Sequence, residues 1–304
     1  MLKCAAITGA TGAIGMGIIK ALLDEGSEVY VFANPDSKRN HVLPRDERVH
    51  VIPCGLNGLK DFVPENGMRA EAFFHLGWAG TTGPGRDDMK MQNQNVAYSL
   101  DAVELAERLG CEVFVGTGSQ AEYGRTDALL SPSTPTFPEN GYGMGKLSAG
   151  LMTRMHARQR GIRHVWARIL SVYGPYDGEH NLIMTIMREL MEGKAPEATA
   201  GEQVWSFLYS EDAAKGLLAM AERGHDGKIY MLGGEETDTL RHYLEDVARV
   251  VGREGAIRFG ALPYREGQVM RLRADLSDTV RDLSWHPETS FTQGIEKTYA
   301  WRKA

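Results

Sequence analysis

The sequence predicts an α/β fold in which helices cover both faces of a doubly wound parallel sheet and a smaller lobe follows at the C-terminal side. Three observations predict it. Short apolar runs alternate with helical patterns over the first 170 residues, a glycine-rich turn separates the first run from the first helical pattern, and beyond Tyr173 the alternation is lost. Strand–helix alternation is typical of parallel sheets, because successive parallel strands need a crossover connection.

The elements of the first half follow in a regular order. The opening apolar run, Leu2 and Cys4 to Ile7, is predicted to be a buried strand, and a helical pattern follows from Met16 to Leu23. The pattern then predicts strands at 28–33, 49–53, 72–76, 112–115 and 165–170, and helices at 96–109 and 142–159. In such a sheet the ligand lies at the carboxyl ends of the strands.

The second half predicts a smaller lobe that closes over the edge of the sheet. Helices are expected at 182–191, 210–222, 240–251 and 291–301, and strands at 203–209 and 228–232. We expect residues 1–170, together with roughly 209–232, to form the main domain, and residues 171–208 and 233–304 to form a substrate-binding lobe.

Composition excludes several classes of function. Lys and Arg number 34 and Asp and Glu number 40, so a formal charge of −6 gives no electrostatic reason to expect nucleic acid or an anionic membrane as a partner. The three cysteines are far apart and the histidines show no ligand spacing, so we expect no metal and reduced thiols. Without a signal peptide or a long apolar run, a cytoplasmic protein is expected.

The glycine-rich turn carries the first candidate site. Gly9, Gly12 and Gly15 recur at a spacing of three between strand and helix, with Thr11, Ala13 and Ile14 between them. Glycines let the backbone approach a diphosphate, and the helix N-terminus supplies amide donors. Glycine clusters also mark ordinary turns, but the position between strand and helix favours a dinucleotide-binding, Rossmann-type domain.

The end of the second strand bears on the choice of nicotinamide cofactor. A cofactor with an unphosphorylated ribose usually meets an acidic residue there. Here Asn34 occupies that place, and Lys38 and Arg39 follow a few residues on. Both cations could pair with a 2′-phosphate, so we expect NADP(H) to be preferred over NAD(H). The alternative is that Lys38 and Arg39 belong to an ordinary solvated loop.

A second group of residues suits hydride transfer. Tyr142 and Lys146 are four apart and share one face of a helix, and Ser119 follows the fifth predicted strand. We expect Lys146 and the nicotinamide to lower the pKa of Tyr142, which moves the proton, while Ser119 orients the substrate oxygen. Glycines at 141, 143 and 145 weaken the helix start, which suggests that something approaches it closely.

Several motifs together resemble the extended short-chain dehydrogenase/reductase family, in the branch that acts on nucleotide-activated sugars. They are T-G-A-T-G-A-I-G from residue 8, F-H-L-G at 74–77, S-Q-A-E-Y-G at 119–124, Tyr142 with Lys146, V-Y-G-P from residue 172, and L-S-W-H-P at 283–287 with Thr289 and Gly294. The likeness runs essentially from end to end of the chain.

The resemblance implies roles for individual residues. It places Gly9, Gly12 and Gly15 at the pyrophosphate, and it makes Ser119, Tyr142 and Lys146 catalytic. It places His75, Gly77 and Trp78 near the cofactor ribose, Asn95 in support of the active-site helix, and Leu56 among the cofactor-binding residues. The implied substrate-binding residues are Ser119, Gln120, Ser171, Asn181, Trp205, Arg265 and Gln268, with Arg265 as the phosphate clamp. In many relatives the helices 96–109 and 142–159 form a homodimer interface.

Departures from the family pattern narrow the expected reaction. Sugar 4,6-dehydratases of this branch carry an Asp-Glu pair where this chain has Gln120 and Ala121, neither of which does acid–base work. We therefore expect chemistry at C4 of a nucleotide sugar, foremost as a 4-keto-6-deoxyhexose reductase. A 4-epimerase with tightly bound NAD is the alternative, and a non-catalytic cofactor-binding or scaffolding relative is the rival from another class.

Overall fold

The computed structural model describes residues 2–304; Met1, the first residue of the expected main domain, lies outside them. Within this range, seven parallel strands form one sheet in the order β11-β6-β5-β4-β1-β2-β3. This order, which places β1 beside both β2 and β4, confirms the predicted doubly wound sheet. The strands are β1 Cys4–Thr8, β2 Glu28–Ala33, β3 Val49–Pro53, β4 Ala72–His75, β5 Val113–Ser119, β6 Arg163–Ile169 and β11 Lys228–Leu232.

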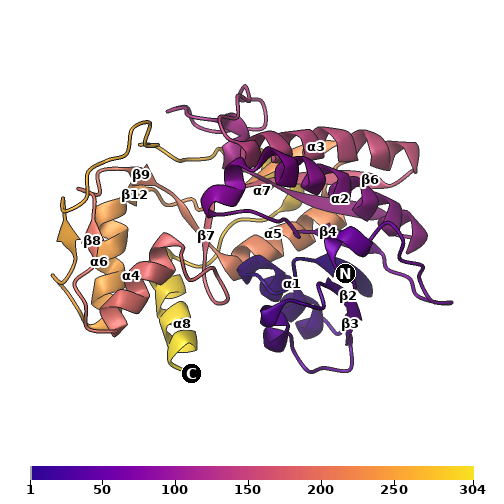
Figure 1. Cartoon of the computed structure of the whole chain (residues 1–304), viewed down its shortest axis with the longest axis horizontal. Coiled ribbons are helices and arrows are strands. Elements are labelled where there is room, and N and C mark those ends of the chain that lie inside the picture. Colours follow the sequence, from indigo (N-terminus) through magenta and orange to yellow (C-terminus); the bar gives the residue numbers. More distant parts are fainter. Residues whose placement is uncertain (1) are drawn as a thin grey trace.

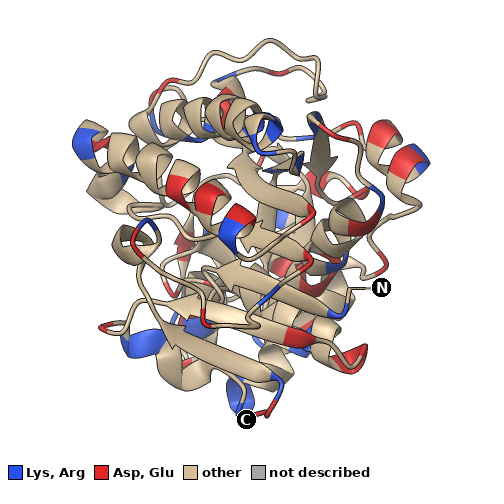
Figure 2. Ribbon diagram, turned by 90° about the vertical axis from the view of Figure 1, so that its right-hand side faces the viewer, with Lys and Arg blue, Asp and Glu red and all other residues tan. Residues whose placement is uncertain are grey.

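Two pairs of helices cover the sheet. Helices α1 and α5 pack against one another on one face, and α2 and α3 do so on the other (Figure 1). Because both faces are covered, the central strands are mainly apolar, and charged residues lie mostly on helices and loops (Figure 2). The helices are α1 Ala13–Asp24, α2 Met89–Arg108, α3 Gly141–Gln159 and α5 Ser210–Arg223, with 3-10 turns η1 Lys38–Val42, η2 Leu56–Gly58, η3 Gly83–Asp87 and η4 Gln120–Tyr123.

Two elements are longer than their apolar patterns predict. β5 continues four residues beyond the expected end at 115, and this places Ser119 at its last position. The extension requires glycine at 116 and 118. A Cβ at either position would clash with the Trp166 side chain on β6, at a distance of 2.3 Å. α2 starts seven residues before the expected start at 96, where the side chain of Asp88 caps the amides of Lys90 and Met91.

The lobe is built from short strand pairs and three helices around their own apolar core. β7 pairs with β10, β9 with β12 and β8 with β13. The single strand expected at 203–209 is two strands in different sheets, and Ser206 between them donates its hydroxyl to Gly234 O. The elements are β7 Ser171–Tyr173, α4 Leu182–Met191, β8 Glu197–Ala198, β9 Val204–Trp205, β10 Phe207–Tyr209, β12 Asp238–Thr239, α6 Leu240–Val251, β13 Arg258–Phe259 and α8 Phe291–Lys303.

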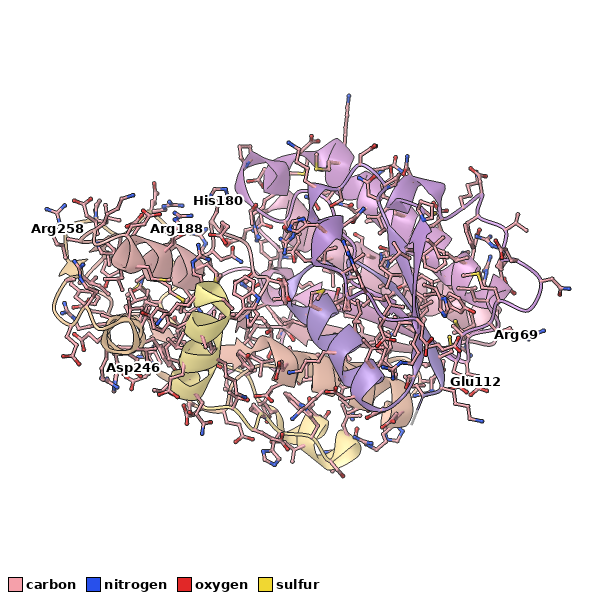
Figure 3. The ribbon with its side chains drawn as sticks, turned by 90° about the horizontal axis from the view of Figure 1, so that it is seen from below. Arg69, Glu112, His180, Arg188, Asp246 and Arg258 are labelled. Atoms are coloured by element: carbon pink, nitrogen blue, oxygen red, sulfur yellow. The ribbon has the colours of Figure 1, made fainter. Side chains whose placement is uncertain are left out.

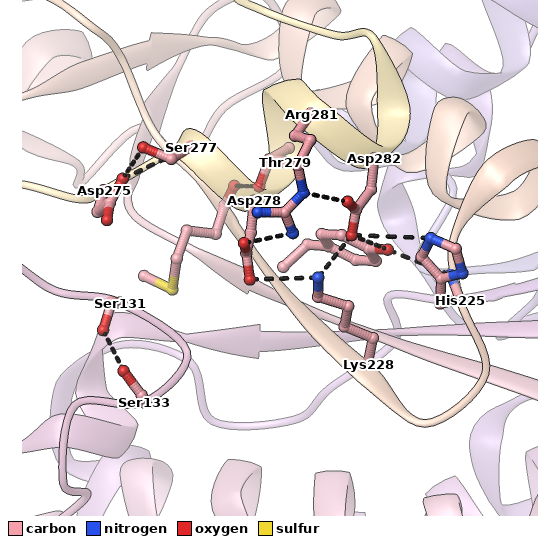
Figure 4. A network of polar contacts seen from close by, with 12 residues as sticks. Ser131, Ser133, His225, Lys228, Asp275, Ser277, Asp278, Thr279, Arg281 and Asp282 are labelled. Atoms are coloured by element: carbon pink, nitrogen blue, oxygen red, sulfur yellow. Dashed lines mark hydrogen bonds and ion pairs between the residues drawn. The ribbon is translucent and has the colours of Figure 1, made fainter.

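Helix α7, Ser277–Leu283, differs from the expected division because it packs on the main sheet rather than in the lobe. Figure 4 shows the polar contacts that hold it: Lys228 on β11 bonds Asp282 at 2.5 Å and Asp278 at 3.2 Å. Leu283 and Trp285 complete the attachment by entering the apolar core beneath α5. The C-terminal segment thus returns to the sheet before α8 enters the lobe.

The lobe lies at the carboxyl ends of the strands. Arg188 and Asp246 of the lobe lie at the opposite end of the molecule from Arg69 and Glu112, which precede β4 and β5 (Figure 3). The space between sheet and lobe is therefore where a doubly wound fold places its ligand. Within residues 2–304, no helix combines the length and the apolar character needed to cross a bilayer.

Candidate active site

Two adjoining cavities lie between the sheet and the lobe. The smaller, of about 300 Å³, follows the glycine-rich turn and the ends of β1 and β5, and includes Ser119, Tyr142 and Lys146. The larger, of about 740 Å³, extends into the lobe. Four residues line both cavities and so mark their junction: Gln120, Ser171, Val172 and Asp177.

The glycine-rich turn is a preformed cradle. Gly9 has a φ of +74°, and a Cβ on it would lie 2.7 Å from Gly77 N, so backbone packing requires a glycine there. Gly15 is equally enclosed, with Gly9 O at 2.6 Å from its Cβ position. Gly12 has no atom nearer than 3.6 Å and caps α1 without a side-chain hydrogen bond. The open space at Gly12 and the unpaired amides of the first turn of α1 can bind a diphosphate, the group that links the two halves of a dinucleotide.

The predicted catalytic residues lie together. Tyr142 is hydrogen-bonded to the Ser119 hydroxyl, which donates its own proton to Gln120 Oε1 at 2.8 Å. Lys146 lies one turn along α3 and is almost fully buried. Its Nζ donates to Thr117 O at 2.7 Å and lies 3.9 Å from the centroid of the Trp78 ring.

The structure does not show the expected lowering of the Tyr142 pKa by Lys146. Burial raises the pKa of Tyr142, and the influences that oppose it are the hydrogen bond from Ser119 and the charge of Arg86. Lys146 is turned toward Thr117, and burial lowers its own pKa to about 7. The Arg86 guanidinium is nearer to the phenol, with its Cζ 4.3 Å from the ring centroid, whereas Lys146 Nζ lies 5.9 Å from the same centroid.

Arg86 is a site residue that the sequence did not single out. It lies in the 3-10 turn η3 between β4 and α2 and also lines the larger cavity. Asp87 beside it accepts a hydrogen bond from Gly141 N, which ties this turn to the start of α3. The only sequence signal is a charged residue in a Gly/Pro-rich stretch, and nothing in that pattern places it over Tyr142.

The glycines at the start of α3 are approached by the chain itself rather than by a ligand. A Cβ on Gly143 would lie 2.3 Å from Ala121 O, and one on Gly141 would lie 2.9 Å from Arg86 O. Asn140 caps the helix by accepting from Gly143 N at 2.8 Å. Close packing against η4 and η3 thus brings Tyr142 to Ser119 and Arg86.

The structure corrects the expected placement of His75 and Asn95. His75 is buried against the α2 face of the sheet, where its ring nitrogens bond Thr8 Oγ1 at 2.9 Å and Ser99 Oγ at 3.1 Å, so it does not line the cofactor groove. Burial lowers its pKa to about 3. Asn95 bonds both backbone groups of Ala79, so it supports the loop that carries Trp78 rather than helix α3.

Of the other residues predicted to bind the cofactor, some line the groove and some do not. Trp78 lines the smaller cavity, whereas Gly77 and Leu56 pack together beside Thr8. Asn34 and Lys38 are exposed on the loop after β2. Arg39 on the same loop donates through Nη2 to Thr11 O at 2.7 Å and Tyr176 O at 2.5 Å, so it reaches the glycine-rich turn from outside.

The predicted substrate residues of the lobe side come together. Six of the seven line the larger cavity, and Ser119 lies in the smaller one; the six are Gln120, Ser171, Asn181, Trp205, Arg265 and Gln268. Trp205 Nε1 donates to Ser171 Oγ at 2.7 Å. Asn181 Nδ2 donates to Asp177 Oδ1 at 2.7 Å, and Asp177 is a second site residue that the sequence reasoning missed.

A buried ion pair between Glu122 and Arg168 holds the backbone of Ser119 in place. Glu122 Oε1 accepts from Ser119 N at 2.9 Å and from Trp166 Nε1 at 3.1 Å, while its Oε2 accepts from Arg168 Nε at 2.7 Å. The Glu122 and Arg168 side chains are 1% and 4% exposed. A charge so far from water is retained only where it is paired, so the pair holds η4 in one conformation.

Comparison with known proteins agrees with this site. The family model described as NAD dependent epimerase/dehydratase family matches residues 5–233. An uncharacterized protein of Methanocaldococcus jannaschii is 25% identical over 310 residues, which are 97% of this chain and 94% of the relative. The dTDP-glucose 4,6-dehydratase of Escherichia coli is 28% identical over 180 residues, which are 57% of this chain and 50% of that enzyme.

Solved structures show the same fold. The UDP-N-acetylglucosamine 4-epimerase of Methanobrevibacter ruminantium M1, in complex with UDP-N-acetylmuramic acid, has a TM-score of 0.88 at 23% identity, with 99% of this chain and 98% of that chain covered. The family model spans well over half of the residues. The chain therefore belongs to the NAD dependent epimerase/dehydratase family, and with it to the enzymes of the extended short-chain dehydrogenase/reductase type.

Proposed function

We propose that this enzyme is a reductase that acts at C4 of a nucleotide-activated sugar, with a 4-keto-6-deoxyhexose as its substrate and Tyr142 as its proton donor. The observation that carries the proposal is the hydrogen-bonded pair of Tyr142 and Ser119 beside the junction of the two cavities. If the nucleotide occupies the larger cavity, its sugar is the part of the ligand that extends to these two hydroxyls. The reacting oxygen of the sugar would then meet both.

The residues divide the work of reduction among them. A nicotinamide cofactor held by the Gly12 face and the α1 amides would supply the hydride. Ser119 donates a hydrogen bond to the keto oxygen and fixes its orientation. Tyr142 keeps its proton because burial raises its pKa, and it transfers that proton to the oxygen as negative charge develops there. Dehydration lacks support, because Gln120 and Ala121 stand where the acid pair of a dehydratase is expected.

The test is a panel of nucleotide sugars and their 4-keto derivatives, assayed with NADH and NADPH. We expect stoichiometric oxidation of the reduced cofactor with a 4-keto sugar. Tyr142→Phe should lower kcat by about 10²- to 10⁴-fold, the usual contribution of general acid–base catalysis, with little change in KM. Unchanged turnover in Tyr142→Phe would exclude the assigned role of this residue.

NADP(H) is the proposed cofactor of choice. The support is the absence of a carboxylate at Asn34 and the presence of Lys38 and Arg39 on the same exposed loop. We expect a lower Kd for NADPH than for NADH, and Lys38→Ala should raise the former alone. Equal or tighter binding of NADH would overturn this preference.

A 4-epimerase is the second candidate, favoured by the fold shared with the 4-epimerase of M. ruminantium. It would use the same residues, retain NAD through purification and interconvert two nucleotide sugars without net oxidation. Interconversion with no redox signal in the panel would select it. The scaffolding alternative predicts neither signal, and the contact between Tyr142 and Ser119 argues against it.

The proposal includes a homodimer formed through the helices predicted at 96–109 and 142–159, which correspond to α2 and α3. Its support is a set of exposed apolar residues on α3: Met144, Leu151, Met152 and Met155. Helices α2 and α3 pack side by side on the same face of the sheet (Figure 1), so a second copy could pair with both.

A further inference from the structure

The connection between β7 and α4 carries a carboxylate with one oxygen that has no partner. Asp177 Oδ1 accepts from Gly178 N at 2.8 Å and from Asn181 Nδ2 at 2.7 Å. Asp177 Oδ2 is shielded from solvent, yet it has no hydrogen-bond partner among the described residues. A buried carboxylate oxygen without a donor is costly, so this atom indicates a group that arrives from elsewhere.

Three neighbouring contacts fix where this oxygen lies. Asn181, which begins α4, uses its side-chain amide on Asp177 instead of on its own helix. On the other side, the carbonyl of Tyr176 accepts from Arg39, which also bonds Thr11 O in the glycine-rich turn. Tyr176 itself has a φ of +64°, an uncommon conformation for a residue with a side chain. Asp177 is therefore held between the turn and the lobe.

Asp177 is also one of the four residues common to both cavities. If the nucleotide lies in the larger cavity and C4 must reach Tyr142 in the smaller one, the sugar ring occupies the junction. The other polar residues there are already engaged: Gln120 Oε1 accepts from Ser119, and Ser171 Oγ accepts from Trp205. Asp177 Oδ2 differs from both in having no donor at all among the described residues, so it is the junction oxygen that a sugar hydroxyl would satisfy.

Charge favours a neutral hydroxyl as the missing donor. Both the cofactor and a nucleotide sugar bring diphosphates, so a carboxylate close to a phosphate would be repelled. Burial already raises the pKa of Asp177 to about 6, and only Arg39 among nearby cations opposes this. A sugar hydroxyl both donates and accepts, so it can satisfy Oδ2 without adding charge.

We propose that Asp177 is a specificity-determining residue that accepts a hydrogen bond from a hydroxyl of the substrate sugar at the junction of the two cavities. This inference rests on the proposed function, because it requires a nucleotide sugar in the larger cavity. The contact selects sugars that carry a hydroxyl at the matching carbon, and it leaves recognition of the nucleotide and of the cofactor to other residues.

The test compares binding of UDP-glucose and dTDP-glucose with binding of UDP and dTDP, by calorimetry on the cofactor-loaded enzyme. Asp177→Ala should weaken the nucleotide sugar by about 10- to 100-fold, the usual effect of losing a hydrogen bond to a charged group. The Kd values of UDP, dTDP and NADPH should change by less than about threefold. Asp177→Asn should lose less than about tenfold, because a hydroxyl can accept from the amide that replaces Oδ2.

Deoxy analogues of the sugar identify the hydroxyl. One deoxy analogue should bind the wild type as weakly as UDP-glucose binds Asp177→Ala. The same analogue should bind Asp177→Ala no more weakly than that, because the hydrogen bond is already lost. Asp127→Asn, an exposed carboxylate on another loop, is the matched control and should bind like wild type. Thermal unfolding of each variant reports whether the β7–α4 connection is intact.

Three outcomes would overturn the inference. Equal weakening of UDP and UDP-glucose would assign Oδ2 to the nucleotide, and a change confined to NADPH would assign it to the cofactor. Unchanged binding throughout would mean that no ligand uses this oxygen. Failure of the proposed function is seen separately, because the wild type would then oxidise no reduced cofactor with any 4-keto sugar of the panel.

Discussion

Lys146 shows how burial, rather than sequence spacing, decides the charge of a residue. Its ammonium group has one hydrogen bond, to Thr117 O, and rests on the face of Trp78. Removal from water lowers the pKa to about 7, and the charge of Glu122, which favours the protonated form, does not offset this. Near neutral pH this side chain therefore exchanges its proton readily, and a bound cofactor could change its charge.

The lowered pKa of Lys146 makes stability depend on pH. The value moves from 10.5 in an unperturbed lysine to about 7 in the fold. Between these values the unfolded chain binds a proton that the folded chain does not, so the free energy of unfolding rises with pH over this window, by at most about 1.4 kcal/mol per pH unit. Below pH 7 both states are protonated and the penalty is constant.

Urea unfolding of wild type and Lys146→Met between pH 6 and about pH 11 measures this effect. Wild type should gain stability relative to the variant as the pH rises above 7, and the gain should level off near the unperturbed value. Lys20→Met, in which a lysine side chain that is 61% exposed is removed, serves as the control for loss of a surface charge. Parallel curves for wild type and Lys146→Met would contradict the assigned pKa.

Arg86 is expected to set the ionisation of Tyr142. Its guanidinium lies 4.3 Å from the ring centroid and opposes the rise in pKa caused by burial. Arg86→Met should raise that pKa further, and each unit removes about 90% of the phenolate at a given pH. We expect the rate of alcohol oxidation, which needs the phenolate, to fall about tenfold at pH 8. The rate of keto reduction, which needs the phenol, should fall less.

The measurement is kcat against pH in both directions, with Arg86→Lys as the variant that keeps the charge but loses the planar contact. Since Arg86 also lines the larger cavity, KM is expected to rise in both directions, and kcat separates the two effects. An equal fall of kcat in the two directions would show that Arg86 does not act through the ionisation of Tyr142.

At the scale of single elements, the short turn η4 depends on one buried ion pair. Glu122 accepts from Ser119 N and from Trp166 Nε1, and it pairs with Arg168. Removal of one partner leaves an unpaired buried charge, which costs about 3–5 kcal/mol. Glu122→Val should lose stability by this amount and also lower kcat, because Ser119 N loses its acceptor.

A double-mutant cycle separates the two effects. Glu122→Val/Arg168→Met should recover much of the stability lost in Glu122→Val, because no buried charge remains, but not its kcat. Glu122→Gln keeps an acceptor for Ser119 N, so kcat should stay near wild type while stability falls. Equal loss of kcat in the Gln and Val variants would show that charge, rather than the hydrogen bond to Ser119 N, matters for catalysis.

Elements built by local patterns could be predicted, and contacts made across the fold could not. The alternation of apolar runs predicts the sheet, and the glycines at 9, 12 and 15 predict the cradle, because each needs only neighbouring residues. His75 ends a strand like a site residue, yet its side chain faces the buried side toward Ser99. Arg86 lies in the short turn η3 and Asp177 on the loop before α4, and contacts distant in sequence fix the position of both segments.

At the scale of the molecule, the site depends on how the lobe is fastened to the sheet. Arg39 joins the glycine-rich turn to the β7–α4 connection. The same connection is held to α8 by the Tyr176 ring against Trp301, with centroids 5.0 Å apart, and by Arg302, which bonds both oxygens of Glu179. These contacts fix the width of the junction, so cofactor and substrate sites form a single unit.

The proposed homodimer is the prediction that concerns the whole molecule. Leu151, Met152 and Met155 on α3 are 47%, 48% and 51% exposed, and Met155 lies one turn beyond the other two. Adjacent apolar side chains on an exposed helix are typical of an interface. Leu151→Glu/Met155→Glu should therefore shift the mass measured by light scattering from two chains to one, with the fold retained by circular dichroism. Leu129→Glu is the control. Leu129 is also apolar and 50% exposed, but it lies on a loop outside α3, so this change should leave the dimer intact. A wild type that is a monomer at all concentrations, or equal effects of the two changes, would contradict an interface through α3.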